Sequence, residues 1–356
     1  MEAASDPSGE PRRRRPRYAG THPRRFAEKY KERDPARYAE TVEKVLASGK
    51  TPAGTHRPIL VREVLEILAL SPGDRVVDCT LGNGGHARAV LGRILPGGML
   101  LGLDADPVEL PRTVARLRAE GFGPESFQAV RTNHAALPRV LADSGFGPAD
   151  ALLADLGLSS MQIDDPERGF SFKADGPLDM RMHPGRALSA ADWLRKVTAP
   201  ELARALTENS DEPRAERLAQ ALAGRAFTRT RELADAIRAA FGRGPESERE
   251  LAVRRVFQAI RIEVNGEFDA LESLLRALPG CLAPGGRAVF LTFHSGEDRR
   301  VKRAFEAGLR AGVFDGGSGE VIRPSRGEQR ENPRSAPAKL RWVRRAVDEA
   351  RSASEG

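Results

Sequence analysis

The sequence predicts an α/β fold, in which a parallel sheet with helices on both faces carries an inserted helical domain. Three observations support this prediction. Short apolar segments alternate with helix-forming runs between residues 75 and 155, and a glycine-dense turn follows the first segment. Residues 161–261 instead have apolar side chains three and four positions apart. The alternation indicates βαβ units, and the change of period indicates a helical insertion.

The first strand and the turn after it are the most informative part of the chain. Two β-branched residues precede Asp78, and the turn that follows contains Gly82, Gly84 and Gly85 before a helix-forming run begins. Glycines let the backbone approach a ligand closely. The second strand, at 99–103, ends in Asp104, and an acid at that place holds the ribose hydroxyls of a nucleotide-type ligand. Together these features predict a pocket for an adenosine-containing cofactor.

The residue before the turn distinguishes between two such cofactors. A dinucleotide loop faces a pyrophosphate, which the carboxylate of Asp78 would repel. The ammonium and sulfonium groups of S-adenosylmethionine would instead be attracted. The segment therefore favours a methyl donor over NAD, and a plain glycine turn that packs a helix on the sheet stays open as the alternative.

The remaining elements follow from the same patterns of period and turn residues. We expect helices at 58–70, 87–95, 107–119, 189–196, 199–208, 215–225, 230–241, 247–265, 268–281 and 299–311, further strands at 127–131, 149–155 and 287–293, and a turn at 284–286. A long loop covers 156–185, and such loops are usually functional.

Four polar residues follow predicted strands at the point where each strand ends: Asp78, Asp104, Asp155 and His294. Ligands of open α/β sheets bind beyond the carboxyl ends of the strands. We therefore expect these side chains to meet at one rim. The alternative for each residue alone is a helix cap or a turn.

Composition places limits on the partners and the compartment. Of the net charge of +7, residues 1–50 contribute +5 and residues 321–345 contribute +6, so the rest of the chain is mildly acidic. Basic ends predict a polyanionic partner, with solvated tails as the alternative. Cys79 and Cys281 lack metal spacing and are interpreted as free thiols of a reducing cytoplasm. No apolar run is long enough to cross a membrane, and no secretory signal is recognisable, so we expect a cytoplasmic protein.

The domain organisation follows from these composition changes. We predict a basic, disordered extension at 1–50, a discontinuous sheet domain formed by 51–160 and 262–345, the helical insertion at 161–261 and a tail at 346–356.

Long and unusual motifs give the chain a family resemblance. It resembles the bacterial 16S ribosomal RNA (cytosine-N4)-methyltransferases over about residues 55–345. The matching segments lie at 56–60, 78–86, 102–107, 155–162, 168–172, 176–182, 257–265, 293–298, 332–335 and 338–341.

The resemblance implies a Rossmann-like class I S-adenosylmethionine-dependent methyltransferase sheet, with the insertion as the RNA substrate domain. It implies methylation of the exocyclic N4 of a specific cytidine in the decoding centre of 16S rRNA, in the small ribosomal subunit, without a metal. It also suggests a homodimer. The cofactor contacts of the family fall on Gly84, Gly85, His86, Asp104, His134, Asp155 and Gln162. His134 departs from the family, which usually has an aromatic residue such as phenylalanine at this position.

Asp155 is the candidate catalytic residue. The lone pair of a cytosine amine is delocalised into the ring, and a hydrogen-bond acceptor on the N4 hydrogens would stabilise the cationic transition state. Asp155 at the end of the fourth strand could supply that acceptor, or could serve only the cofactor. His294 is a second candidate for a polar contact with the base, with helix capping as its alternative.

Further residues could hold an extruded RNA base and its phosphates. Candidate stacking residues are Phe170, Phe172 and Met182, for which core packing is the alternative. Candidate phosphate contacts, for which a surface ion pair is the alternative, are Arg168, Arg181, Arg334, Lys339 and Arg341. Two other functions stay open at this point: a non-catalytic RNA-binding or assembly factor with the same fold, and a nicotinamide-dependent oxidoreductase.

Overall fold

The computed structural model describes residues 58–185 and 188–347. The predicted extension at 1–50 and most of the predicted tail, from residue 348 onward, lie outside the described residues.

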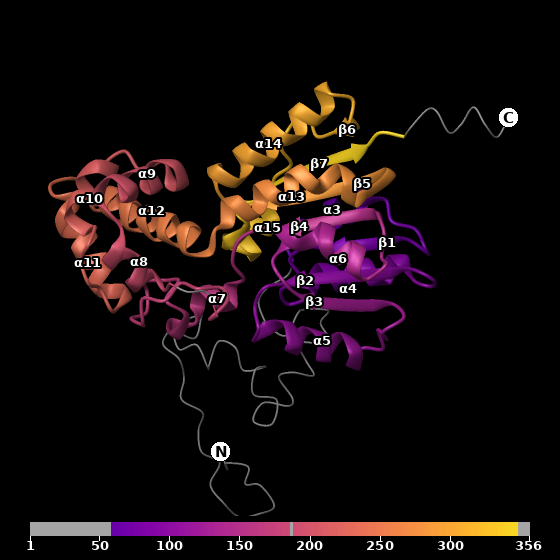
Figure 1. Cartoon of the computed structure of the whole chain (residues 1–356), viewed down its shortest axis with the longest axis horizontal. Coiled ribbons are helices and arrows are strands. Elements are labelled where there is room, and N and C mark those ends of the chain that lie inside the picture. The colour runs from indigo at the N-terminus through magenta and orange to yellow at the C-terminus, as the bar shows by residue number, and fades with distance from the viewer. Residues whose placement is uncertain (1–57, 186–187, 348–356) are drawn as a thin grey trace, which may run out of the picture. The chain divides into compact units, whose positions relative to one another are not determined.

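A seven-stranded sheet is the centre of the fold (Figure 1). Its strands are β1 (Arg75–Asp78), β2 (Met99–Asp104), β3 (Phe127–Arg131), β4 (Ala149–Asp155), β5 (Leu282–Thr292), β6 (Phe314–Gly317) and β7 (Lys339–Arg345). Their order is β3-β2-β1-β4-β5-β7-β6, in which the first five are parallel and β7 is antiparallel to β5 and β6. The order β3-β2-β1-β4-β5 is that of doubly wound nucleotide-binding sheets.

Helices cover both faces of the sheet, as the βαβ alternation predicts. Alternate residues of one strand enter different cores: Val76 packs in the cluster with helices α3 (Val61–Leu68), α4 (Gly85–Ile94) and α5 (Glu109–Ala119). Val77 packs in the cluster with α6 (Leu137–Asp143), α13 (Glu267–Cys281) and α14 (Ser295–Arg310). Because side chains alternate across a strand, two fully buried neighbours require a core on each face.

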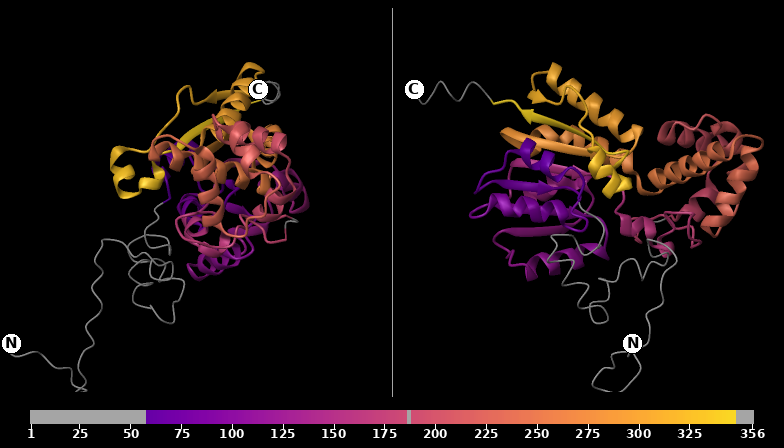
Figure 2. Two further views of the ribbon diagram at one scale, coloured as in Figure 1. Left: turned by 90° about the vertical axis from the view of Figure 1, so that its left-hand side faces the viewer. Right: turned by 180° about the vertical axis from the view of Figure 1, so that it is seen from behind.

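The helices between β4 and α13 include a group with a hydrophobic core of its own, which extends from Phe170 to Val264. In the views of Figure 2 the rose-to-orange helices of this segment pack against one another. They are α8 (Ala190–Lys196), α9 (Ala199–Ser210), α10 (Ala215–Leu222), α11 (Thr230–Phe241) and α12 (Glu246–Asn265), and a shorter helix, α7 (Ser160–Asp164), precedes them in the chain. The domain boundaries at 160/161 and 261/262 stay a prediction.

The amide of Asn265, at the end of α12, joins that helix end to the loop before α8. It donates to the carbonyl of Met180 at 2.8 Å and accepts from the backbone N–H of Met182 at 2.8 Å. The side chain is buried, with 4% of its surface exposed, so all of its bonds are formed within the protein.

Several expectations differ from the structure. The long loop predicted at 156–185 contains α7 and a 3₁₀ turn at Pro166–Arg168. The predicted turn at 284–286 lies inside β5, where the pairing with β4 passes from Ala149↔Leu282 to Ala151↔Arg287. The extra residues form a bulge, in which Gly285 has a φ of +78°. Strands β6 and β7 were also not predicted, because two of the four residues of β6 are glycines and β7 is rich in arginine.

Both cysteines are free and buried, as expected. Within residues 58–185 and 188–347, no helix has the length and apolar character that crossing a membrane requires.

Candidate functional site

Three carboxylates meet at the carboxyl ends of neighbouring strands. β1 lies between β2 and β4, and the three strands end in Asp78, Asp104 and Asp155. β5 lies next to β4 and is followed by His294. The predicted convergence of these four residues at one rim is therefore confirmed.

The glycine turn between β1 and α4 is held in a conformation that favours glycine. Gly82 has a φ of +48° and Gly84 a φ of +68°. The hydroxyl of Thr113 on α5 donates to the carbonyl of Gly82 at 2.6 Å, and the N–H of Gly84 donates to the carbonyl of Leu81 at 2.7 Å. α4 begins at Gly85, so its first N–H groups face the rim.

We expect Gly84→Ala to destabilise the protein by about 1–3 kcal/mol. A Cβ there would lie 2.9 Å from Cγ2 of Thr113, and the positive φ adds about 1 kcal/mol for a residue with a side chain. Urea unfolding measures the change. Gly92→Ala is the matched control inside α4, since a Cβ there meets nothing within 4 Å and should stabilise the helix by about 0.5–1 kcal/mol. Equal effects of the two variants would contradict the strained turn.

Asp104 braces the glycine turn. Its two oxygens accept from the N–H groups of Gly82 at 2.7 Å and Asp106 at 2.8 Å. Burial raises the pKa of this carboxyl, while the two N–H groups act in the opposite direction. Since a carboxylate has about four acceptor sites, the group can still accept further hydrogen bonds.

Asp155 has one oxygen without a hydrogen-bond partner. Oδ1 is buried and unpartnered among the described residues, although 28% of the side chain is exposed. Oδ2 lies 3.5 Å from Nδ1 of His86, and the backbone N–H donates to the hydroxyl of Thr80 at 2.6 Å. The pKa of Asp155 is raised to about 8. Desolvation is the main cause, and the negative charges of Asp78 and Glu297 contribute less.

Asp78 adds negative charge next to Asp155. Its side chain is 1% exposed, and Oδ1 accepts from the N–H of Thr80 at 3.0 Å. Burial is the main cause that raises its pKa to about 7, with a smaller contribution from the charge of Asp104. These carboxylates disfavour one another's ionisation, so a cation bound among them would be stabilised.

The other predicted cofactor residues surround the same rim. His134 begins a 3₁₀ turn after β3, and its Nε2 is buried without a hydrogen-bond partner among the described residues. Burial lowers the pKa of His134 to about 4, so the ring is neutral at pH 7. Gln162 on α7 forms a capping box with Ser159, and its Nε2 donates to Oδ2 of Asp106 at 2.8 Å. Gln162 therefore supports the loop that carries Asp104.

Asp106 is a residue of this site that the sequence reasoning missed. It is 2% exposed, accepts from Gln162 and pairs with Arg168 at 2.9 Å. It thus connects the loop after β2 with the segment after β4. The available signal was the second acid in Asp104-Ala-Asp106, two residues beyond the strand end.

His294 caps α14, which was the alternative to a contact with the base. Its Nδ1 accepts from the backbone N–H of Glu297, and its Nε2 lies 3.2 Å from Oε1 of the same residue. Glu297 is 4% exposed. Burial acts to raise its pKa, but His294, the N–H of Phe293 and Arg261 together hold the pKa below the usual range. Glu297 therefore stays charged and contributes to the field at Asp155.

The candidate phosphate contacts all form ion pairs. Lys339 and Arg341 on β7 both pair with Asp298, at 2.9 and 2.7 Å. Of the others, Arg168 pairs with Asp106, Arg181 with Asp179 and Arg334 with Asp164. These residues therefore form ion pairs, which was the alternative to phosphate contacts.

The candidate stacking residues contribute to packing. Phe170 belongs to the core of the helical segment, and Phe172 and Met182 pack against that core. The rings of Phe172 and Phe257 meet edge to face with centroids 5.2 Å apart.

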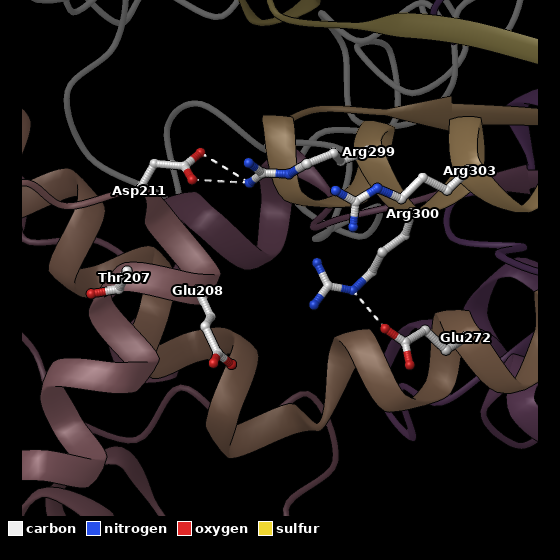
Figure 3. Close-up of a pocket in the computed structure, with 7 residues that line it drawn as sticks. All are labelled: Thr207, Glu208, Asp211, Glu272, Arg299, Arg300 and Arg303. Atoms are coloured by element: carbon white, nitrogen blue, oxygen red, sulfur yellow. Dashed lines mark hydrogen bonds and ion pairs between the residues drawn. The ribbon is translucent and has the colours of Figure 1, made fainter.

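A polar pocket of about 320 Å³ lies between α9, α13 and α14, and none of the predicted site residues line it. Figure 3 shows its ion pairs, from Arg299 to Asp211 and from Arg300 to Glu272. Its lining residues are Thr207, Glu208, Asp211, Glu272, Arg299, Arg300 and Arg303. Three acids and three arginines cancel in formal charge, so this pocket is not a strong anion site.

The sheet order and the acidic, glycine-lined rim are those of a Rossmann-like methyltransferase. The model of the MraW methylase family matches residues 53–346. The chain belongs to the MraW methylase family, and it is an S-adenosylmethionine-dependent methyltransferase.

Curated relatives cover nearly the whole chain. It is 47% identical over 343 residues to "Ribosomal RNA small subunit methyltransferase H 1" of Lachnoclostridium phytofermentans, covering 94% of this chain and 93% of that protein. It is 44% identical over 322 residues to "Ribosomal RNA small subunit methyltransferase H" of Rubrobacter xylanophilus, covering 85% of this chain and 99% of that protein. Among solved structures, a putative rRNA-methylase from Clostridium thermocellum is 12% identical with a TM-score of 0.41, covering 83% of this chain and 99% of that one.

Proposed function

We propose that this protein methylates the exocyclic N4 of a cytidine in the decoding centre of the small-subunit ribosomal RNA. The observation that carries the proposal is the unpartnered, buried Oδ1 of Asp155 at an acidic rim. An acceptor of this kind suits an amine that becomes positively charged as it is methylated. The names of the relatives indicate small-subunit ribosomal RNA as the substrate.

The residues at the rim fit the cofactor. Nε2 of His134 and Oδ1 of Asp155 are among the buried polar atoms that have no hydrogen-bond partner within the described residues, and buried polar atoms normally have one. In the proposal, Asp104 accepts from the ribose hydroxyls, and the N–H groups at Gly84 and Gly85 hold the polar end of the ligand. The neutral ring of His134 contacts the base, and Gln162 acts through Asp106.

When bound, S-adenosylmethionine supplies an electrophilic methyl group on a sulfonium sulfur, whose carbon–sulfur bond breaks with its electron pair retained on sulfur. The contribution of the protein is mainly to align the reactants, which can supply about 7–11 kcal/mol of barrier reduction. Asp155 accepts an N4 hydrogen at Oδ1 and takes that proton as positive charge develops on the amine. The N–H electron pair stays on N4.

The helical insertion at 161–261 is proposed to hold the RNA. The chain enters it shortly after β4, which ends in Asp155, and passes from it into α13, where the ring centroid of Phe268 lies 5.7 Å from that of His294. A segment joined to the rim at both ends is suited to present an extruded base there.

We expect the affinity for the donor to rise with pH up to about 8. Without ligand, Asp78 and Asp155 have pKa values raised to about 7 and about 8, so one or both hold a proton at neutral pH. A bound cation lowers these pKa values, so binding releases protons, and removing protons from solution favours binding. Above about pH 8 both groups are already ionised in the free protein, and the affinity levels off.

Titration calorimetry in buffers of different ionisation enthalpy measures this proton release. S-adenosylhomocysteine is the matched control, because it lacks the sulfonium charge and should release fewer protons. A donor affinity that is constant between about pH 6 and 9, or that follows the same curve as the control, would contradict a charge-based site.

Mass mapping of small-subunit RNA tests the proposed substrate. RNA from cells that lack the protein should contain one decoding-centre cytidine lighter by a methyl group. The purified protein with labelled donor should restore that group on the RNA or on the assembled subunit. A normal mass at every cytidine would refute the target, and binding without methylation would favour the assembly-factor alternative.

A further inference from the structure

The hydrogen bond made by His86 determines which of its ring nitrogens carries the hydrogen. Nε2 lies 3.0 Å from the carbonyl oxygen of Ile59. A carbonyl only accepts, so Nε2 must donate and Nδ1 is left with a lone pair. The ring is 6% exposed, and burial lowers the pKa of His86 to about 4, so the neutral form persists at physiological pH.

That lone pair faces a carboxyl oxygen. Nδ1 lies 3.5 Å from Oδ2 of Asp155. Two lone pairs repel, so an attractive contact needs a hydrogen between the atoms, and only the carboxyl can supply it. The charged groups that act on Asp155 from other elements are Asp78 on β1 and Glu297 on α14, and both favour its protonated form.

We propose that His86 is the positioning residue that holds the proton of Asp155: its unprotonated Nδ1 accepts the carboxyl hydrogen at Oδ2 and leaves the unpartnered Oδ1 to accept a hydrogen of the substrate amine. This role rests on the proposed function of Asp155 and differs from a contact between His86 and the cofactor. The geometry explains why one oxygen of the carboxyl is oriented toward a partner while the other has none.

The proton then follows a closed cycle through Asp155. Binding of a cation at the rim expels the carboxyl proton to solvent. During methylation, Oδ1 takes one proton from N4, whose electron pair stays on the nitrogen, and the carboxyl becomes neutral. A half-turn of the carboxyl about its Cβ–Cγ bond presents that hydrogen to Nδ1 of His86, which restores the starting arrangement.

Nitrogen-15 NMR of the wild-type histidine rings tests the arrangement without donor or RNA. We expect Nε2 of His86 to stay protonated from pH 6 to 9, while the Nδ1 signal changes with a midpoint near 8 as Asp155 loses its proton. His134 is the internal control, since its pKa of about 4 predicts no titration in this range. A hydrogen on Nδ1 at neutral pH, or an Nδ1 signal constant from pH 6 to 9, would overturn the proposal even if the protein methylates RNA.

Two substitutions separate the functions of the two ring nitrogens. In His86→Gln, the side-chain amide reaches the position of Nε2 and keeps the bond to Ile59 but lacks an acceptor for Asp155. In His86→Asn, the amide reaches only the position of Nδ1 and keeps that acceptor. Single-turnover rates at saturating donor should have a midpoint about one pH unit lower in the glutamine variant, because the protonated carboxyl loses its acceptor.

The rate plateau of the glutamine variant should fall by up to about tenfold, since Asp155 becomes a weaker base. The asparagine variant should restore the midpoint toward that of the wild type. If both variants weaken donor binding and leave the midpoint unchanged, His86 only holds the cofactor and the proposal fails. Absence of methylation in the wild-type protein would instead refute the proposed function and leave the NMR result to decide the proton position.

Discussion

Replacement of Asp155 by asparagine is expected to lower the single-turnover rate of methyl transfer by about 10²–10⁴-fold at neutral pH. An amide of nearly the same size fills the space but cannot take the N4 proton at the unpartnered Oδ1 position. RNA affinity should be almost unchanged. Donor affinity should change by less than about tenfold, which is the free energy that corresponds to a shift of one pKa unit. Rapid-quench kinetics measures the rate, and calorimetry and filter binding measure the affinities.

Asp150→Asn is the matched control for this variant. Asp150 lies on the same strand as Asp155 but at its opposite end, where its carboxylate accepts from the N–H of Arg75 at 2.8 Å. Its replacement should leave the methylation rate unchanged. If Asp155→Asn reduces RNA affinity as much as the rate, or leaves the rate intact, Asp155 does not act at the methyl group and serves only the cofactor or the fold.

Asp104→Ala is expected to weaken donor binding by about 1–3 kcal/mol, a factor of about 5–150, because a pair of ribose hydroxyls loses its acceptor. The same change leaves the N–H groups of Gly82 and Asp106 without their partner and should lower the urea midpoint. Calorimetry gives the affinity and urea unfolding gives the stability.

Asp104→Asn separates the two effects. The amide oxygen keeps one acceptor for the turn, so stability should recover more than donor affinity does. An Asp104→Ala protein that binds the donor as tightly as the wild type would show that the ribose lies elsewhere, and the pocket assignment would be wrong.

Local patterns predicted most of the elements that form the rim. Strands β1, β2 and β4 are short apolar segments that end in an acid, and α11 occupies the predicted range 230–241. Residues of one strand lie next to each other in the sequence, so its period and its end are visible there. The convergence of Asp78, Asp104 and Asp155 follows because parallel neighbouring strands end at the same edge.

The parts that could not be predicted depend on long-range pairing. β7 is an arginine-rich segment whose charges are tolerated because Lys339 and Arg341 meet Asp298, about forty residues earlier in the chain. Asp106 is held by Arg168 from beyond β4. A charge pattern does not reveal its partner, so the same arginines were equally compatible with phosphate contacts.

The bonds of Asn265 hold the end of α12 against the loop at Met180 and Met182, which leads into α8. The chain therefore enters and leaves the group of helices α8 to α12 at neighbouring points. Changes in the length or sequence of these helices can therefore alter which substrate is bound without altering the sheet. The residues at the strand ends can then keep the same chemistry for different substrates.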